Sequence, residues 1–149
     1  MTVLEHLCFS ARVRGVQEIE HNADAAIKAV GLQAFSSRMA ATFSGGNKRK
    51  LSLGIALIGN PTVLLLDEPS SGMDVVAKRL MWKTLAAVVA GRSLLLTTHS
   101  IEEADALADR VGIMAQRMLA MGTSDYLRHK HGKAFYIHLV VKSAAQYLR

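Results

Sequence analysis

Two short apolar runs stand out in the pattern of hydrophobic and polar positions along the chain. Val63-Leu64-Leu65-Leu66 and Leu94-Leu95-Leu96 contain no polar residue and no alternation. A continuous run of Val and Leu is typical of a strand that is covered on both faces, as in a parallel α/β sheet. The pattern therefore predicts strands over residues 63–66 and 93–98, each buried on both sides.

Most of the remaining chain has the spacing of apolar residues that predicts amphipathic helices. Helices are predicted over residues 2–16, 22–30, 75–90, 101–107 and 123–129, with another that begins at Ser44. Residues suited to capping stand at several predicted starts, namely Thr2, Ser44, Ser100 and Thr123. For the helix over residues 75–90, the predicted apolar side comprises Val76, Leu80, Leu85, Val88 and Val89.

Three further strands are predicted after residue 110. They cover residues 111–115, residues 118–121 and a final segment in which apolar side chains alternate, Phe135, Ile137, Leu139 and Val141. The order strand, helix, strand, helix, strand predicts parallel crossovers. We therefore expect an α/β fold with a parallel sheet, preceded by a small helical subdomain that has no strands.

Composition narrows the class of protein without selecting a partner. The chain has 149 residues, enough for one domain, and it is 50% hydrophobic with 5% aromatic residues. Its one cysteine, Cys8, excludes an internal disulfide and suits a reducing compartment. The net charge of +6 is compatible with nucleic acid, acidic lipid headgroups or polyphosphate ligands.

No membrane-spanning segment or signal peptide is predicted. The longest apolar runs, such as residues 85–90, are far shorter than the roughly 20 residues that a transmembrane helix needs. Glu5 and His6 interrupt the apolar pattern at the amino terminus. Any link to a membrane is therefore expected to come from a partner or from a segment outside this chain.

Two adjacent carboxylates, Asp67 and Glu68, directly follow the first predicted strand. Pro69 lacks an N–H and favours extended geometry at Glu68, so strand pairing is expected to stop there. Open α/β sheets bind ligands at the carboxyl ends of their strands. Like charges beside an apolar strand cost free energy that a metal ion such as Mg²⁺ would relieve. The alternative is a strand that ends in a solvated Asp-Glu turn.

The helix that begins at Ser44 has an unfavourable first turn. Gly45 and Gly46 each cost about 1 kcal/mol against Ala in a helix. The basic run 48–50 adds positive charge at the end where the helix dipole is already positive. Bare backbone N–H groups and positive charge together indicate an anion site. The alternative is a flexible loop followed by a solvated basic face.

A histidine, His99, follows the second apolar run, as Asp67 and Glu68 follow the first. Parallel strands would bring these side chains to one edge of the sheet. A polyphosphate bound with Mg²⁺ needs a carboxylate for the metal, a group that orients water and a donor to the terminal phosphate. The three residues supply these types, although a histidine at a strand end can also be purely structural.

Four motifs now occur in a telling order: Ser44-Gly45-Gly46-Asn47, Leu64-Leu65-Leu66-Asp67-Glu68-Pro69, Ser71-Gly72-Met73-Asp74 and Thr98-His99-Ser100. In type, order and spacing they resemble the nucleotide-binding domain of an ABC transporter. The basic run 48–50 and the segment 100–104 resemble the A subfamily, which is associated with lipid transport. The resemblance implies a partial P-loop NTPase core, with ATP and Mg²⁺ as cofactors.

The resemblance assigns a first group of residues to a partner's nucleotide. Ser44, Gly45, Gly46 and Asn47 match the signature motif, which contacts the γ-phosphate of ATP bound by a second ATPase domain in a head-to-tail pair. Asp74 matches the loop that links the two sites across that pair.

The resemblance assigns a second group of residues to catalysis. Asp67 matches the carboxylate that acts on Mg²⁺ through water, and Glu68 matches the base that polarises the attacking water. His99 matches the histidine that touches the γ-phosphate.

The chain departs from the family in one respect. The phosphate-binding motif Gly-x-x-x-x-Gly-Lys-Ser/Thr and the glutamine loop that follows it are absent from the 149 residues. We therefore expect the later part of a nucleotide-binding domain that is inactive alone. Its expected parts are residues 1–42 as the remainder of the helical subdomain, 43–122 as the ATPase core, and 123–149 as a final helix and strand.

The family also implies partners and a location. The expected partners are the second ATPase domain and the transmembrane domains of a transporter, at the cytosolic face of a membrane, with no nucleic acid. One alternative is a non-membrane ABC ATPase that acts on nucleic acid or ribosomes. Another is a non-catalytic donor of the signature motif.

Overall fold

The structure is a computed structural model that describes residues 1–132. The chain divides into two compact units, Met1–Ala108 and a second that begins at Asp109. The strand predicted over residues 135–141 lies outside the described residues. The division into 1–42, 43–122 and 123–149 concerns functional parts, and it stays a prediction.

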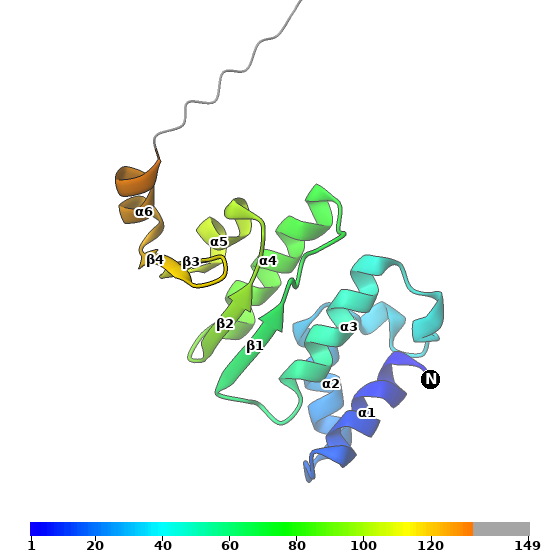
Figure 1. Cartoon of the computed structure of the whole chain (residues 1–149). Helices are drawn as coiled ribbons and strands as arrows, with labels where there is room; N and C mark the ends of the chain where they lie inside the picture. The colour runs from blue at the N-terminus through cyan, green and yellow to red at the C-terminus, as the bar shows by residue number, and fades with distance from the viewer. Residues whose placement is uncertain (133–149) are drawn as a thin grey trace, which may run out of the picture. The chain divides into compact units, whose positions relative to one another are not determined.

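The first unit combines helices with a pair of strands (Figure 1). Its elements are α1 (Val3–Val13), α2 (Ile19–Ala29), two 3-10 turns (Gln33–Phe35 and Ala40–Thr42), α3 (Gly45–Leu57), β1 (Val63–Asp67), α4 (Val75–Val89), β2 (Ser93–Thr97) and α5 (Ile101–Leu107). The second unit contains β3 (Val111–Met114), β4 (Met118–Gly122) and α6 (Ser124–His131).

The predicted helix starts are confirmed where the sequence offers a cap. The Thr2 hydroxyl accepts from the Glu5 N–H at 3.2 Å, and the Glu5 carboxylate accepts from the Thr2 N–H at 2.8 Å, which completes a capping box. Helix α2 begins at Ile19, earlier than predicted. Its cap residue, Glu18, makes no side-chain hydrogen bond, so the sequence has no capping pattern that marks this helix start.

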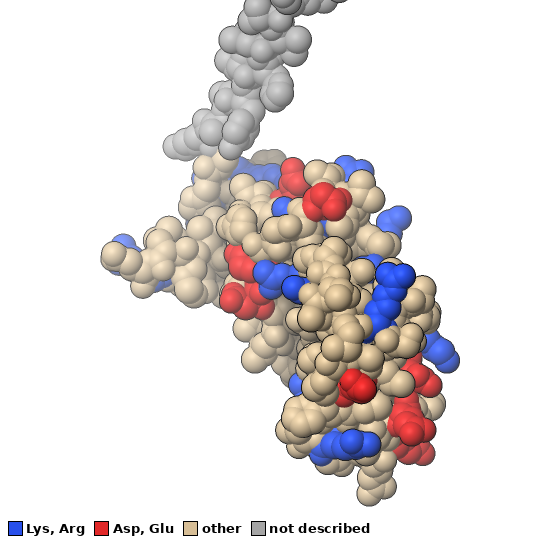
Figure 2. Space-filling view, turned by 90° about the vertical axis from the view of Figure 1, so that its right-hand side faces the viewer, with Lys and Arg blue, Asp and Glu red and all other residues tan. Residues whose placement is uncertain are grey.

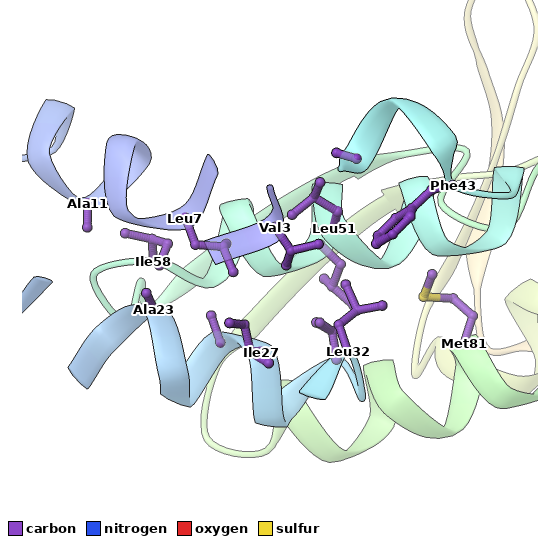
Figure 3. Packing of buried hydrophobic residues seen from close by; sticks show 14 of the residues in the cluster. Val3, Leu7, Ala11, Ala23, Ile27, Leu32, Phe43, Leu51, Ile58 and Met81 are labelled. Carbon is purple, nitrogen blue, oxygen red and sulfur yellow. The ribbon is translucent and has the colours of Figure 1, made fainter. Parts of the chain in front are cut away.

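Helices α1, α2 and α3 pack around a common apolar core (Figure 3). The figure shows Val3, Leu7 and Ile27 directed into the space between the helices. Gly54 of α3 faces this core, where an added Cβ would lie in van der Waals contact with Leu7, 3.4 Å from its Cδ2. Helices α1 and α2 were predicted from the apolar spacing and are present, while residues 1–42 as a helical subdomain stay a prediction.

Strands β1 and β2 pair in parallel, in a register that places Asp67 opposite Thr97. The prediction that both faces of the strands are covered is wrong. Leu64 is 2% exposed, whereas Leu65 is 71% and Leu95 66% exposed. The elements of the first unit cover one face of the pair only, so the side chains of the other face remain open to solvent.

The buried side of α4 matches the prediction in part, because Leu85 and Val88 are buried as predicted. Met81, Leu85 and Val88 are buried, whereas Val76 is 78% and Leu80 49% exposed. Val88 follows Met81 and Leu85 at helical spacing, so these residues form the inward stripe. Leu80 is rotated by about 100° from that stripe, since an α-helix has 3.6 residues per turn.

In the second unit, β3 and β4 form an antiparallel pair with an irregularity between Ile113 and Met114. The strand predicted over residues 111–115 is present as β3, and its parallel place in the series after β2 stays a prediction. The short connection from β3 to β4 forms a hairpin, and a hairpin joins antiparallel strands. Helix α6 follows β4 and starts with the predicted Thr123 cap.

The surface of residues 1–132 carries both kinds of charge. On the face seen in Figure 2, basic and acidic side chains are interspersed with wide uncharged areas. Among these residues, no helix combines the length and the apolar character that crossing a bilayer requires.

Candidate functional site

The ends of β1 and β2 bring Glu68 and His99 into direct contact. His99 Nδ1 lies 2.8 Å from Glu68 Oε2. The parallel register explains this contact, because each residue comes just after the last residues of its strand. The predicted convergence of a carboxylate and an imidazole at one edge of the sheet is therefore observed.

The backbone at Glu68 is unusual. Its φ of 47° lies in the left-handed region, so the prediction of extended geometry at Glu68 is wrong. Two hydrogen bonds hold this conformation. The Glu68 N–H donates to the Thr97 carbonyl at 3.0 Å, and the Glu68 carbonyl accepts from the Ser71 N–H at 3.1 Å. Such strained residues cost about 1–3 kcal/mol and cluster at functional sites.

Asp67 stands beside this pair on β1. Its Oδ1 accepts a hydrogen bond from the Thr97 hydroxyl of β2. The side chain is exposed, and its second carboxylate oxygen remains available to a ligand at the end of the strand. Asp67 and Glu68 therefore present two carboxylates at the same edge of the sheet.

The carboxylates at this edge of the sheet are the type of ligand that Mg²⁺ takes. Mg²⁺ keeps several waters and is bound by one or two carboxylates together with phosphate oxygens of a ligand. Residues 1–132 contain no group of three or more His, Cys, Asp or Glu that could hold a metal ion. Asp67 fits the role of a carboxylate that acts on a hydrated ion, with phosphates as the remaining ligands.

A second cluster surrounds the start of α3. The Ser44 hydroxyl accepts from the Asn47 N–H at 3.4 Å and caps the helix. A cavity of about 280 Å³ lies next to this cap. It is lined by Ser44, Gly45, Gly46, Asn47, Lys50, Gly72, Met73, Asp74, Ala77 and Leu80. The predicted anion site therefore has a hollow beside it.

Packing against the residues that the structure describes does not require the two glycines at this start. A Cβ at Gly45 would meet nothing within 4 Å, and one at Gly46 would make an ordinary contact of 3.7 Å with Met73 Cε. Neither glycine has the positive φ that an L side chain avoids. Bare backbone at a helix start is suited to phosphate, since its N–H groups are free to donate.

Asp74 belongs to this second cluster. It caps α4, where its Oδ1 accepts from the Ala77 N–H at 2.9 Å, and it also lines the cavity. The candidate residues thus form two groups. One contains Asp67, Glu68 and His99, and the other contains Ser44, Gly45, Gly46, Asn47 and Asp74.

Sequence reasoning missed Thr97. It contacts Asp67, and its only sequence signal is a polar residue placed at the end of an apolar strand. Lys50, from the basic run 48–50, and Met73, from the motif Ser71-Gly72-Met73-Asp74, both line the cavity. Lys50 lies one turn after Gly46 on the same helix face.

Comparisons with known proteins agree with the resemblance seen in the motifs. A family model described as ABC transporter matches residues 1–71. The mouse retinal-specific phospholipid-transporting ATPase ABCA4 is 45% identical over 147 residues, which are 96% of this chain and 6% of that protein. The human phospholipid-transporting ATPase ABCA3 is 43% identical over 150 residues, or 98% of this chain and 9% of that protein. The chain thus spans less than a tenth of these relatives.

The fold has a counterpart among solved structures. MJ1267, an ATP-binding cassette of an ABC transporter, is similar with a TM-score of 0.76 and 21% sequence identity. The similarity covers 87% of this chain and 58% of that one. The predicted fold class, a partial P-loop ATPase core of α/β type, is thereby confirmed.

Proposed function

Because the chain belongs to the ABC transporter family and is of the A-subfamily type, we propose that it forms part of an ATP-hydrolysing domain in a lipid transporter. The family implies nucleotide binding. The assignment of individual residues, of Mg²⁺ and of lipid as the transported substrate is our proposal. The names of the similar proteins, which describe phospholipid-transporting ATPases, support the substrate class.

In this proposal, Glu68 acts on the water that attacks the terminal phosphate, and His99 acts on that phosphate. Glu68 is the general base, and His99 donates to the γ-phosphate while its other ring nitrogen contacts Glu68. Asp67 would hold hydrated Mg²⁺, whose charge would neutralise the developing charge on the phosphates. The contact of 2.8 Å between Glu68 and His99 is the observation that carries this assignment.

The cavity at α3 serves a different nucleotide. Ser44, Gly45, Gly46 and Asn47 would contact the γ-phosphate of ATP bound by a second ATPase domain in a head-to-tail pair. Asp74 lines the same cavity and would link the two sites. The complete protein would join such a pair to transmembrane domains, and the chain would lie at the cytosolic face of that membrane.

Split-domain complementation tests the catalytic assignment. The chain is coexpressed with a polypeptide that carries the phosphate-binding and glutamine loops of an A-subfamily domain, and ATP turnover is measured. Glu68→Gln is expected to lower turnover by about 100-fold or more, as loss of a catalytic base does, while ATP binding persists. Glu102→Gln, at an exposed position of α5, is the matched control. Equal turnover in the Glu68 variant and the parent would overturn the assignment.

A second candidate function is that of a non-catalytic signature donor. The cavity beside Ser44 is built from this chain alone, while the sequence contains no phosphate-binding motif of its own. In this case the chain would stimulate a partner domain that has an intact phosphate loop. Gly45→Asp would abolish the stimulation by placing a carboxylate next to phosphate, whereas Glu68→Gln would leave it unchanged.

A further inference from the structure

Helices α4 and α5 are joined by a hydrogen bond that the proposed function does not use. Trp82 Nε1 of α4 donates to Glu103 Oε1 of α5 at 3.0 Å. Glu103 is 1% exposed, so this contact lies in the interior of the first unit. It pairs an aromatic donor with a buried carboxylate whose residue follows His99 in the chain, at the start of α5.

A carboxylate is an expensive choice for this position. Burying a polar group costs free energy unless it is hydrogen-bonded, and Glu103 Oε2 has no hydrogen-bond partner among the described residues. A leucine of similar size would avoid this cost. The favourable charge at the start of α5 does not require Glu103 either, because the exposed Glu102 also lies in the first turn.

The chain segment between this contact and His99 is fixed by two further hydrogen bonds. The Glu103 N–H donates to the Ser100 hydroxyl at 3.3 Å, which caps α5. The Ser100 N–H donates to the Thr98 hydroxyl at 3.0 Å. His99 is therefore held between the end of β2 and a helix start that is anchored on α4.

These contacts and the chain between them form a closed path that begins and ends at Glu68. From Glu68 the chain runs through a short loop into α4, which carries Trp82. Trp82 contacts Glu103, the start of α5 leads back to His99, and His99 contacts Glu68. Because His99 itself is 74% exposed, little else restrains its side chain on the solvent side.

We propose that Glu103 is a positioning residue, which anchors the start of α5 on Trp82 and thereby holds His99 against Glu68. The proposal rests on the proposed function for its biological meaning, since it assumes that His99 and Glu68 act together. It makes a structural claim that is measured on the chain without nucleotide. Failure of the complementation experiment and failure of this proposal are therefore distinguishable.

The test uses NMR on the full chain with labelled histidine and tryptophan. The chain has one tryptophan, so its indole N–H gives a single resonance, and His99 among the six histidines is assigned by its loss in His99→Asn. The measured quantity is the change in the His99 ring chemical shift caused by Glu68→Gln. This change reports the contact between the two side chains.

The change is measured in the parent and in four backgrounds. Trp82→Phe removes the donor and keeps an aromatic ring, and Glu103→Leu removes the acceptor. In both variants, the change in the His99 ring chemical shift caused by Glu68→Gln is expected to fall by about threefold or more, because residues in one hydrogen-bond network are energetically coupled. Glu103→Gln keeps an acceptor oxygen and is expected to retain the response, as is Glu102→Gln, the exposed control on the same helix.

Two outcomes decide the proposal even where a variant is unstable. Trp82→Phe preserves most of the packing, so it serves as the decisive variant if Glu103→Leu does not fold. A full His99 response in folded Trp82→Phe would overturn the proposal, even if that variant unfolds at a lower temperature. Equal loss in the Glu102 control would overturn it too, because the effect would then be a general one on α5.

Discussion

His99 Nδ1 lies 2.8 Å from Glu68 Oε2, and this contact joins the ends of two parallel strands. Its position is set by the register of the sheet, which brings Asp67 opposite Thr97. The imidazole is 74% exposed and the carboxylate 32% exposed. A pair this open to water contributes little to folding.

Because His99 is exposed, a His99→Ala variant should keep its stability but lose activity. Exposed ion pairs are worth about 0–1 kcal/mol, so the free energy of unfolding of the chain should change by less than about 1 kcal/mol. In the complementation experiment, the same variant should lose most of its ATP turnover, because the donor to the γ-phosphate is gone. Chemical denaturation and turnover measured on the same variant check this. A large loss of stability together with full turnover would contradict it.

The 149-residue chain alone should neither bind ATP tightly nor hydrolyse it. Its sequence has no Gly-x-x-x-x-Gly-Lys-Ser/Thr motif, whose backbone N–H groups and lysine hold the phosphates in this class of ATPase. The carboxylates at Asp67 and Glu68 cannot replace that loop, because they repel phosphate. The check is a sensitive phosphate-release assay at millimolar ATP. Turnover by the purified chain that disappears in Glu68→Gln would show the expectation to be wrong.

Local chemistry made the helices and the site predictable. Thr2, Ser44 and Ser100 cap helices where the sequence places a hydroxyl before an apolar stripe. The convergence of Glu68 and His99 follows from two apolar runs that each end in polar groups, provided the strands are parallel. In both cases a short stretch of sequence contains the whole physical cause.

The features that were mispredicted depend on more distant parts of the chain. A strand of Val and Leu does not reveal which faces are covered, so the exposure of Leu65 could not be derived from β1 itself. The residue before a proline normally favours extended geometry, but at Glu68 hydrogen bonds to Thr97 and Ser71 override that preference. The contact between Trp82 and Glu103 joins separate helices and has no local pattern.

The open face of the β1–β2 pair should make the chain prone to aggregation, and Leu65 and Leu95 are the residues to change. They are 71% and 66% exposed, on strands whose apolar face has no cover within the first unit. Leu65→Thr combined with Leu95→Thr should reduce concentration-dependent light scattering while changing the free energy of unfolding by about 0.5 kcal/mol or less, as is usual for surface positions.

Leu64 provides the matched control for this pair. It is adjacent to Leu65 on β1, but it points to the other face and is 2% exposed. Leu64→Ala should destabilise the chain by about 2–5 kcal/mol through lost burial and a cavity. Equal effects of the Leu64 and Leu65 substitutions on stability would contradict the one-sided burial of the strand.

A final prediction concerns Gly45 and Gly54 of α3, which have different surroundings. A Cβ at Gly45 would meet nothing within 4 Å, whereas at Gly54 it would lie 3.4 Å from Leu7 Cδ2 and 3.6 Å from Val30 Cγ2. Gly45→Ala should therefore keep the stability of the chain or raise it by up to about 1 kcal/mol, since alanine favours helix. Gly54→Leu should lower it by about 1–3 kcal/mol, because the added atoms overpack the contact between α3 and α1.

Gly45→Ala and Gly54→Leu also distinguish an effect on packing from an effect on ligand binding. If Gly45 is kept for the close approach of a phosphate, Gly45→Ala should weaken stimulation of a partner ATPase domain while the chain remains fully folded. Gly54→Leu should weaken stimulation only in proportion to the folded fraction measured by circular dichroism. Full stimulation by folded Gly45→Ala would mean that bare backbone at Gly45 is not needed, and the signature role would then depend on Ser44, Gly46 and Asn47.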